Sequence, residues 1–157
     1  MLFDEEMMLR AIAEAEKAAQ LSEVPVGAVI TDADGNVIAA GFNTRETDIS
    51  PTAHAEIKVI EAAAKATGSR RLSGCTLYVT LEPCPMCAGA VINSGLKRLV
   101  YGAFDEKGGA CTSVTNLFEC GFSHKPLVRG GILESRCAAL MTGFFSRLRK
   151  KSSGDLE

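Results

Sequence analysis

The chain has 157 residues, of which 46% are hydrophobic and 23% charged, the size and composition of one soluble globular domain. No apolar run approaches the roughly 18 residues that a membrane span requires. The acidic start Asp4-Glu5-Glu6 lacks the basic and apolar segments of a signal peptide. We therefore expect a cytoplasmic protein with no membrane partner.

The net charge of −2 gives no overall indication of nucleic-acid binding, but the charges are unevenly distributed. Residues 1–66 contain twelve acidic and five basic residues, whereas residues 67–157 contain seven acidic and twelve basic ones. Basic residues concentrate at Arg147, Arg149, Lys150 and Lys151. Two interpretations are open: a face that contacts a polyanion, or a helix end whose charges favour solubility and the helix dipole.

Hydrophobic periodicity and turn residues predict helices and strands along the whole chain, with no internal repeat. The predicted helices are Glu5 to Gln20 with Asp4 as N-cap, about Thr52 to Thr67, Pro83 to about Asn93, and Leu133 to about Lys150. The predicted strands are Val26 to Thr31, Val37 to Phe42, Thr76 to Thr80, Arg98 to Gly102 and Leu127 to Arg129, the first two forming a hairpin.

Residues 105–125 are predicted to be irregular, with one helical turn around 114–120, and residues 152–157 to be a mobile tail. Residues 1–151 would then form one domain. The order of elements predicts an α/β protein with one mixed five-stranded sheet that helices cover on both faces, a three-layer α-β-α sandwich.

One constellation indicates a metal site. His54-Ala55-Glu56 is followed, 27 residues after Glu56, by Pro83-Cys84-Pro85-Met86-Cys87. His54, Cys84 and Cys87 are ligands of the kind that zinc prefers, and three protein ligands with an open fourth position are typical of catalytic zinc. Such a metal lowers the pKa of its bound water to about 7. A carboxylate that does not bind the metal, here Glu56, can then transfer protons.

Helix beginnings matter for this site. Cys84 and Cys87 fall at the start of a predicted helix, where backbone amides and the helix dipole favour the thiolate that binds zinc. Residues two apart point to nearly opposite sides of a helix. His54 and Glu56 can therefore serve one centre only if they lie at the first turn of their helix, with the metal beyond its end.

Other interpretations of these residues remain open. The Cys-x-x-Cys pair alone is compatible with a redox site, although that leaves His54 and Glu56 unexplained. A fourth ligand would make the zinc site structural. The candidates for that ligand are Cys75, Cys111, Cys120 and His124.

The pattern is the H-x-E…P-C-x-x-C signature of zinc-dependent nucleobase deaminases. Over about residues 5–150, the chain resembles the bacterial tRNA-specific adenosine deaminases, a family of the cytidine and deoxycytidylate deaminase superfamily. The resemblance rests on residues 23–29, Asn43, residues 51–56, residues 77–84 and Phe144-Phe145. It implies a cytidine-deaminase-like fold, one Zn²⁺ per subunit, a homodimer, and a tRNA anticodon stem-loop as substrate, whose wobble adenosine is hydrolysed to inosine.

The resemblance also assigns roles to single residues. Glu56 would be catalytic, with His54, Cys84 and Cys87 as metal ligands. The implied substrate contacts are Asn43, Asp105, pocket-lining Val26 and Ala28, the backbone amide of Ala55 and the carbonyl near Pro83.

Phe144 and Phe145 point about 100° apart on a helix, so one ring is expected in the core. The other could stack on an unpaired nucleotide beside Arg147, Arg149 and Lys150, or both rings could be buried.

Two other functions stay possible: a deaminase of free bases or nucleosides such as guanine or cytosine, and a non-catalytic zinc-stabilised RNA-binding module. Glu106 and the loop Cys120 to His124 depart from the family pattern and leave the choice of tRNA open.

Overall fold

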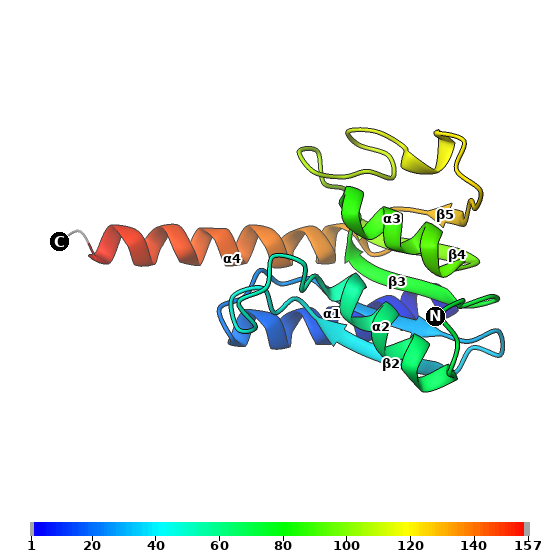
Figure 1. Ribbon diagram of the computed structural model, residues 1–157. Helices are drawn as coiled ribbons and strands as arrows, with labels where there is room; N and C mark the ends of the chain where they lie inside the picture. Colours follow the sequence, from blue (N-terminus) through cyan, green and yellow to red (C-terminus); the bar gives the residue numbers. More distant parts are fainter. Residues whose placement is uncertain (1, 156–157) are drawn as a thin grey trace.

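The computed structural model describes residues 2–155 and consists of four α-helices, five strands and one short 3-10 helix (Figure 1). The helices are α1 (Phe3–Gln20), α2 (Ala55–Thr67), α3 (Pro85–Ser94) and α4 (Glu134–Asp155), and the 3-10 helix is η1 (Leu117–Glu119). The strands are β1 (Gly27–Thr31), β2 (Val37–Phe42), β3 (Thr76–Leu81), β4 (Arg98–Ala103) and β5 (Leu127–Arg129).

The strands form one mixed sheet in the order β2-β1-β3-β4-β5. The predicted hairpin is confirmed: β1 pairs antiparallel with β2, and also with β3. The pairs β3–β4 and β4–β5 are parallel; helix α3 connects the first pair, and a long loop that contains η1 connects the second. Strands β1, β3 and β4 lie at the centre and are almost fully buried, which explains their continuous apolar character.

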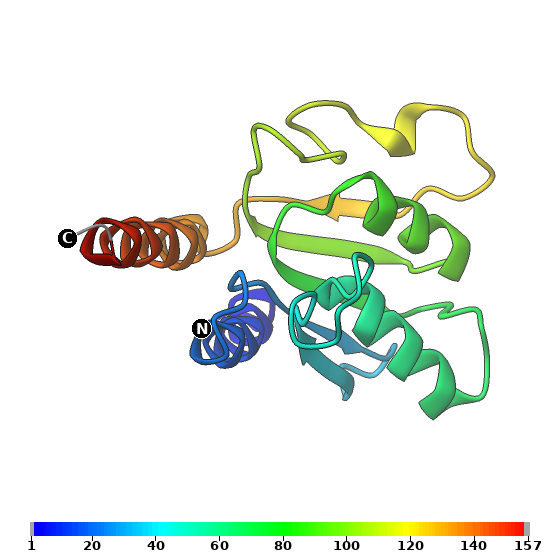
Figure 2. The same ribbon diagram turned by 60° about the vertical axis from the view of Figure 1, so that its left-hand side comes forward.

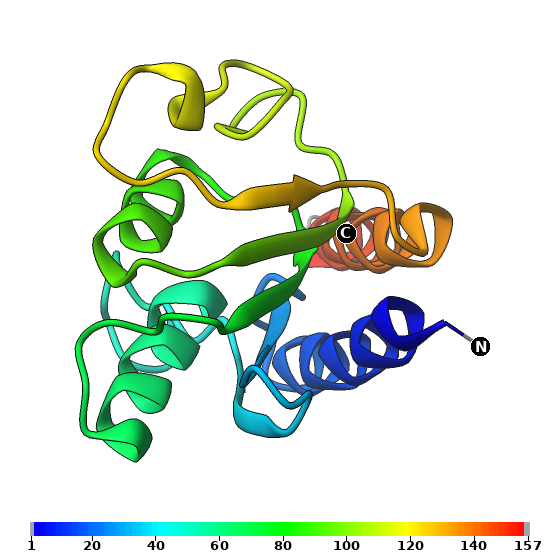
Figure 3. The same ribbon diagram turned by 90° about the vertical axis from the view of Figure 1, so that its right-hand side faces the viewer.

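The three-layer arrangement is confirmed. Helices α2 and α3 cover one face of the sheet, and α1 and α4 cover the other (Figure 3). Each face has its own apolar cluster, one that includes Val59, Leu77 and Val91, and one that includes Met8, Val29 and Val100. The amino-terminal ends of α2 and α3 lie at the edge of the sheet where β3 ends, the edge at which open α/β sheets usually bind ligands.

Asp4 is not the N-cap of α1, because the helix already begins at Phe3. Its carboxylate is buried and accepts hydrogen bonds from Tyr78 Oη at 2.9 Å and from Arg98 Nη2 at 2.9 Å. Arg129 Nη1 donates to it at 3.1 Å. A short acidic side chain that could cap a helix is used here to join α1 to β3, β4 and β5, a partnership that only the folded chain creates.

Helix α4 continues through Asp155, five residues beyond the predicted end near Lys150. Residues 152–155, assigned to a mobile tail, are therefore helical, and Leu156 and Glu157 lie outside the described residues. The helix packs near its start against β4 and α1 and then projects from the body (Figures 1 and 2). Within residues 2–155, no helix is both long and apolar enough to cross a bilayer.

Candidate active site

His54 is the N-cap residue of α2, with extended backbone angles of φ −70° and ψ 152°. The helix begins at Ala55 and not near Thr52, because residues 43–54 form a loop that has its own hydrogen bonds. His54 therefore stands outside the helix, while Glu56 belongs to its first turn. This arrangement removes the conflict between side chains two residues apart, and it meets the condition that the pair lie at the beginning of the helix.

Cys84 occupies the equivalent N-cap position of α3, and Pro85 is the first helical residue. The predicted start at Pro83 is two residues too early. Proline is favoured at Pro85 because the first amides of a helix have no partner within it. A hydrogen bond from Cys87 and interactions with His54 lower the pKa of Cys84 to about 4, so this thiol is readily ionised.

The three predicted ligands come together in space. His54 Nδ1 lies 3.6 Å from Cys84 Sγ and 3.5 Å from Cys87 Sγ. The donor atoms all lie within 4.8 Å of one another, and among the described residues no other group of three or more metal-ligating side chains is this close. One imidazole nitrogen and two sulfurs form the donor set of catalytic Cys₂His zinc sites, so the residues fit that metal.

None of the candidate fourth ligands joins this cluster within the described residues. Cys111 is buried behind the site, where burial raises the pKa of its thiol to about 12. His124 Nε2 lies 2.7 Å from the Leu96 carbonyl oxygen, a contact that ties its loop to the end of α3. Donation from Nε2–H is the consistent choice because a carbonyl can only accept. Cys120 is exposed.

Glu56 is buried beside the cluster, with 4% of its surface exposed. Burial raises the pKa of its carboxyl group above the ordinary range, because removing the charged form from water is unfavourable. A raised pKa strengthens this carboxylate as a proton acceptor, and the resulting acid can return the proton, as a general base and acid requires. Its position within the site distinguishes it from an ordinary solvated helix carboxylate.

A pocket of ≈ 240 Å³ opens beside these groups. The residues that line it are spread along most of the chain: Val24, Val26, Asn43, Arg45, His54, Ala55, Glu56, Leu81, Glu82, Cys84, Asp105, Met141 and Phe145. Four predicted substrate contacts, Val26, Asn43, Ala55 and Asp105, are therefore brought together. Ala28 and Pro83 are outside this lining: Ala28 is fully buried in the core, and the Pro83 carbonyl accepts from the Ala110 amide at 2.9 Å.

Asn43 and Asp105 are held by their own loops. Asn43 Nδ2 donates to the Val24 carbonyl at 3.1 Å, and its Oδ1 accepts from the Arg45 amide at 3.3 Å. Asp105 Oδ1 accepts from the amides of Lys107 and Gly108 at 3.2 and 3.1 Å. Both side chains face the pocket in a fixed orientation, and Asp105 keeps its second carboxylate oxygen for other contacts.

The two phenylalanines have different environments. Phe144 is buried and Phe145 is 39% exposed. Their rings pack edge to face, with 5.4 Å between the ring centroids. Phe145 is the ring that reaches the pocket. Arg147, Arg149 and Lys150 are exposed beyond it along α4. Of the two alternatives that the sequence left open, the structure shows the one in which one ring is in the core and the other is accessible.

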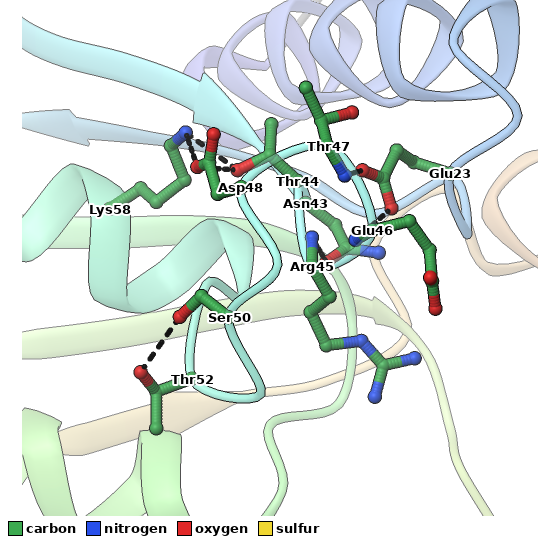
Figure 4. Close-up of polar contacts among 10 residues, drawn as sticks. All are labelled: Glu23, Asn43, Thr44, Arg45, Glu46, Thr47, Asp48, Ser50, Thr52 and Lys58. Atoms are coloured by element: carbon green, nitrogen blue, oxygen red, sulfur yellow. Dashed lines mark hydrogen bonds and ion pairs between the residues drawn. The ribbon is translucent and has the colours of Figure 1, made fainter.

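Two buried carboxylates that sequence reasoning did not single out fix the pocket walls. Glu82 accepts hydrogen bonds from the amides of Thr112 and Ser113 at 2.8 and 2.9 Å, and from the Asp105 amide at 3.1 Å. Glu23 accepts from the amides of Glu46 at 3.0 Å and of Thr47 at 2.7 Å (Figure 4). Each carboxylate accepts the hydrogen bonds that the amides of a loop would otherwise donate to water. The partners are more than twenty residues apart in the chain, so no local sequence signal identifies them.

Comparison with known proteins agrees with this site. The model of the MafB19-like deaminase family matches residues 3–149. The chain is 51% identical over 149 residues to the tRNA-specific adenosine deaminase of Bacillus subtilis (strain 168), covering 94% of this chain and 92% of that protein. It thus belongs to the MafB19-like deaminases and, among them, to the family of tRNA-specific adenosine deaminases.

Solved structures show the same relationship. A structure from a study of A-to-I editing by tRNA:A34 deaminases at the wobble position of transfer RNA has a TM-score of 0.83 and 46% identity, with 86% of this chain and 98% of that chain covered. The guanine deaminase of Nitrosomonas europaea is more distant, with a TM-score of 0.78 and 25% identity over 89% of this chain and 83% of that one.

Proposed function

We propose that this chain hydrolyses adenosine to inosine at the wobble position of a tRNA anticodon, releasing ammonia. The observation that carries this proposal is the buried carboxylate of Glu56, which lines a pocket beside the cluster of His54, Cys84 and Cys87. The high identity to a tRNA-specific adenosine deaminase over nearly the whole chain supports the choice of substrate.

His54, Cys84 and Cys87 would hold one zinc ion per subunit. When bound by three protein ligands, zinc supplies a water molecule of lowered pKa as the nucleophile. The chain contributes two helix amino-terminal ends and one readily ionised thiol to this site. The thiolate charges balance both the cation and the positive ends of the helix dipoles.

Glu56 would carry the protons of the reaction. Its carboxylate accepts a proton from the attacking water, and the carboxylic acid then donates to the purine ring nitrogen and to the departing amine. Burial raises the pKa of Glu56 and so favours the carboxylic acid, the form that donates in the second step of the reaction. The pocket walls around Asn43 and Val26 would hold the base in reach of this carboxylate.

The rest of the substrate would lie outside the pocket. Phe145 is exposed at its rim and can stack on a neighbouring unpaired base. Arg147, Arg149 and Lys150 continue from it along α4 and can approach phosphates. An anticodon loop is already single-stranded, so the target base enters at low cost in lost stacking.

The alternative function is deamination of a free base. The likeness to a guanine deaminase favours it, because the fold and the hydrolytic centre serve both substrates. A free base makes no use of Phe145 or of the basic residues of α4, and this difference separates the two functions.

The test is to incubate the zinc-loaded protein with an anticodon stem-loop that bears a wobble adenosine, and separately with adenosine, cytosine and guanine. Inosine in the stem-loop, together with loss of turnover in Glu56→Gln at unchanged zinc content, supports the proposal. Deamination of a free base with the stem-loop unchanged would support the alternative. Zinc retention without turnover of any substrate would indicate a non-catalytic module.

The proposed substrate also places the protein in the cytoplasm. We further propose that it acts as a homodimer, as the family resemblance implies. The projecting part of α4 exposes Leu148 to 48%, and such a helix gains stability when a second subunit or RNA covers it (Figure 2). Sedimentation equilibrium measures the mass directly, and a monomer at micromolar concentration would contradict the dimer.

A further inference from the structure

The charged side chains that line the pocket are mostly acidic. Glu56, Glu82 and Asp105 bring carboxyl groups to its lining, and Arg45 is the one lysine or arginine among the lining residues. A polynucleotide brings negative charge to the mouth of this pocket, and carboxylates oppose that approach. Arg45 is therefore the lining residue whose positive charge favours the approach of a polynucleotide.

Arg45 forms no ion pair with an acidic side chain within the described part of the chain. Its side chain is exposed and forms no ion pair or side-chain hydrogen bond there. Figure 4 shows its guanidinium extending away from the two hydrogen-bonded networks on either side of it. A guanidinium matches the geometry of a phosphate through two parallel N–H donors.

The backbone that carries Arg45 is fixed from both sides. Asn43 Oδ1 accepts from the Arg45 amide at 3.3 Å, and buried Glu23 accepts from the next two amides, those of Glu46 and Thr47. On the other side, Lys58 Nζ donates to Thr44 Oγ1 at 2.7 Å (Figure 4). Because the loop backbone is already ordered, binding through Arg45 costs the conformational entropy of its side chain but little of its backbone.

The size of the pocket indicates what Arg45 would meet. Sites that enclose a whole drug-sized ligand have volumes of about 300–1,000 Å³, and ≈ 240 Å³ is below that range. The base that reaches Glu56 would fill the interior, and the phosphates of its nucleotide and its neighbours would stay at the mouth, where Arg45 lies.

We propose that Arg45 binds a backbone phosphate next to the target adenosine and thereby makes the site selective for a nucleotide within an RNA strand over a free nucleoside. This inference rests on the proposed function and names the group that the rim of the same site recognises. Glu23 is its positioning residue, because it holds the loop and does not itself line the pocket.

The test compares steady-state kinetics of the wild type and Arg45→Gln on the wobble-adenosine stem-loop. One lost charged contact raises KM about tenfold, and kcat stays within about twofold, since binding to the ground state and transition state is lost equally. Arg10→Gln removes the same charge from an exposed position on α1, across the sheet from α2, and should leave both constants unchanged.

A second series replaces each phosphate around the target adenosine, one at a time, by an uncharged methylphosphonate. At one position the replacement should raise KM about tenfold for the wild type and should have no further effect on Arg45→Gln. Glu23→Gln should raise KM in the wild type and have little effect in the Arg45→Gln background.

The inference is overturned if Arg45→Gln behaves like Arg10→Gln, or if every methylphosphonate affects both proteins equally. Failure of the proposed function gives a different result: the wild type itself then forms no inosine in any stem-loop, and the inference falls with it. Melting temperatures of the variants establish that each remains folded, which the exposed position of Arg45 favours.

Discussion

Gly109 passes directly against the carboxyl group of Glu82, and a β-carbon at this glycine would collide with that group. The close approach lets the loop of residues 105–113 turn its amides toward one buried carboxylate. Asp105, which lines the pocket, is the first residue of this loop, and its own amide donates to Glu82. The wall of the site therefore depends on a glycine that does not itself line the pocket.

Gly109→Ala should lower the free energy of unfolding by about 2 kcal/mol, because overpacking displaces the loop from Glu82. Gly89→Ala is the matched control: no atom lies within 4 Å of the new β-carbon in α3, and alanine favours a helix by about 1 kcal/mol over glycine. Urea unfolding measures both. Equal stabilities of the two variants would show that the loop adjusts freely.

Cys87→Ala should abolish stable zinc binding, because two protein ligands do not hold zinc as three do. The wild type is expected to retain about one zinc ion per chain after dialysis, as measured by plasma mass spectrometry. Cys120→Ala removes an exposed thiol outside the cluster and should retain the metal. Retention of zinc by Cys87→Ala would contradict the proposed ligand set.

Asp4→Asn should lower the free energy of unfolding by about 2 kcal/mol at pH 7, since it removes the charge that Arg98 and Arg129 face. The hydrogen bond from Arg98 is the main reason that the pKa of Asp4 is below its ordinary value of 3.8.

A lowered folded-state pKa means that the ionised Asp4 stabilises the fold above pH 3.8, and that this stabilisation is lost as the pH falls below that value. The difference in unfolding free energy between wild type and Asp4→Asn should therefore shrink below pH 3.8. Asp34→Asn, in the exposed hairpin turn, is the control. A difference independent of pH would show that the ion pairs do not contribute.

The adjacent phenylalanines should respond in opposite ways. Phe144→Ala is expected to cost about 3 kcal/mol of unfolding free energy, because its ring is buried. Phe145→Ala should cost less than about 1 kcal/mol and instead raise KM for the stem-loop about tenfold, through lost base stacking. Unfolding and steady-state kinetics on both variants test this. An unchanged KM in Phe145→Ala would exclude stacking.

Much of the fold was predictable because its signals are local. The hairpin between β1 and β2 and the parallel order of β3 and β4 follow from residue periodicity and turn residues within short segments. Helix beginnings were less predictable: α2 starts at Ala55 and α3 at Pro85, two to three residues after the predicted positions. The loops before them are shaped by distant partners.

The sequence by itself predicted the candidate metal ligands His54, Cys84 and Cys87 and the candidate proton-transferring carboxylate Glu56, since their chemistry resides in the side chains and their spacing. Only the tertiary structure decided which phenylalanine is buried and that Arg45 lines the pocket without forming an ion pair. The reason is physical: burial and electrostatic surroundings depend on residues that are far apart in the chain and adjacent only after folding.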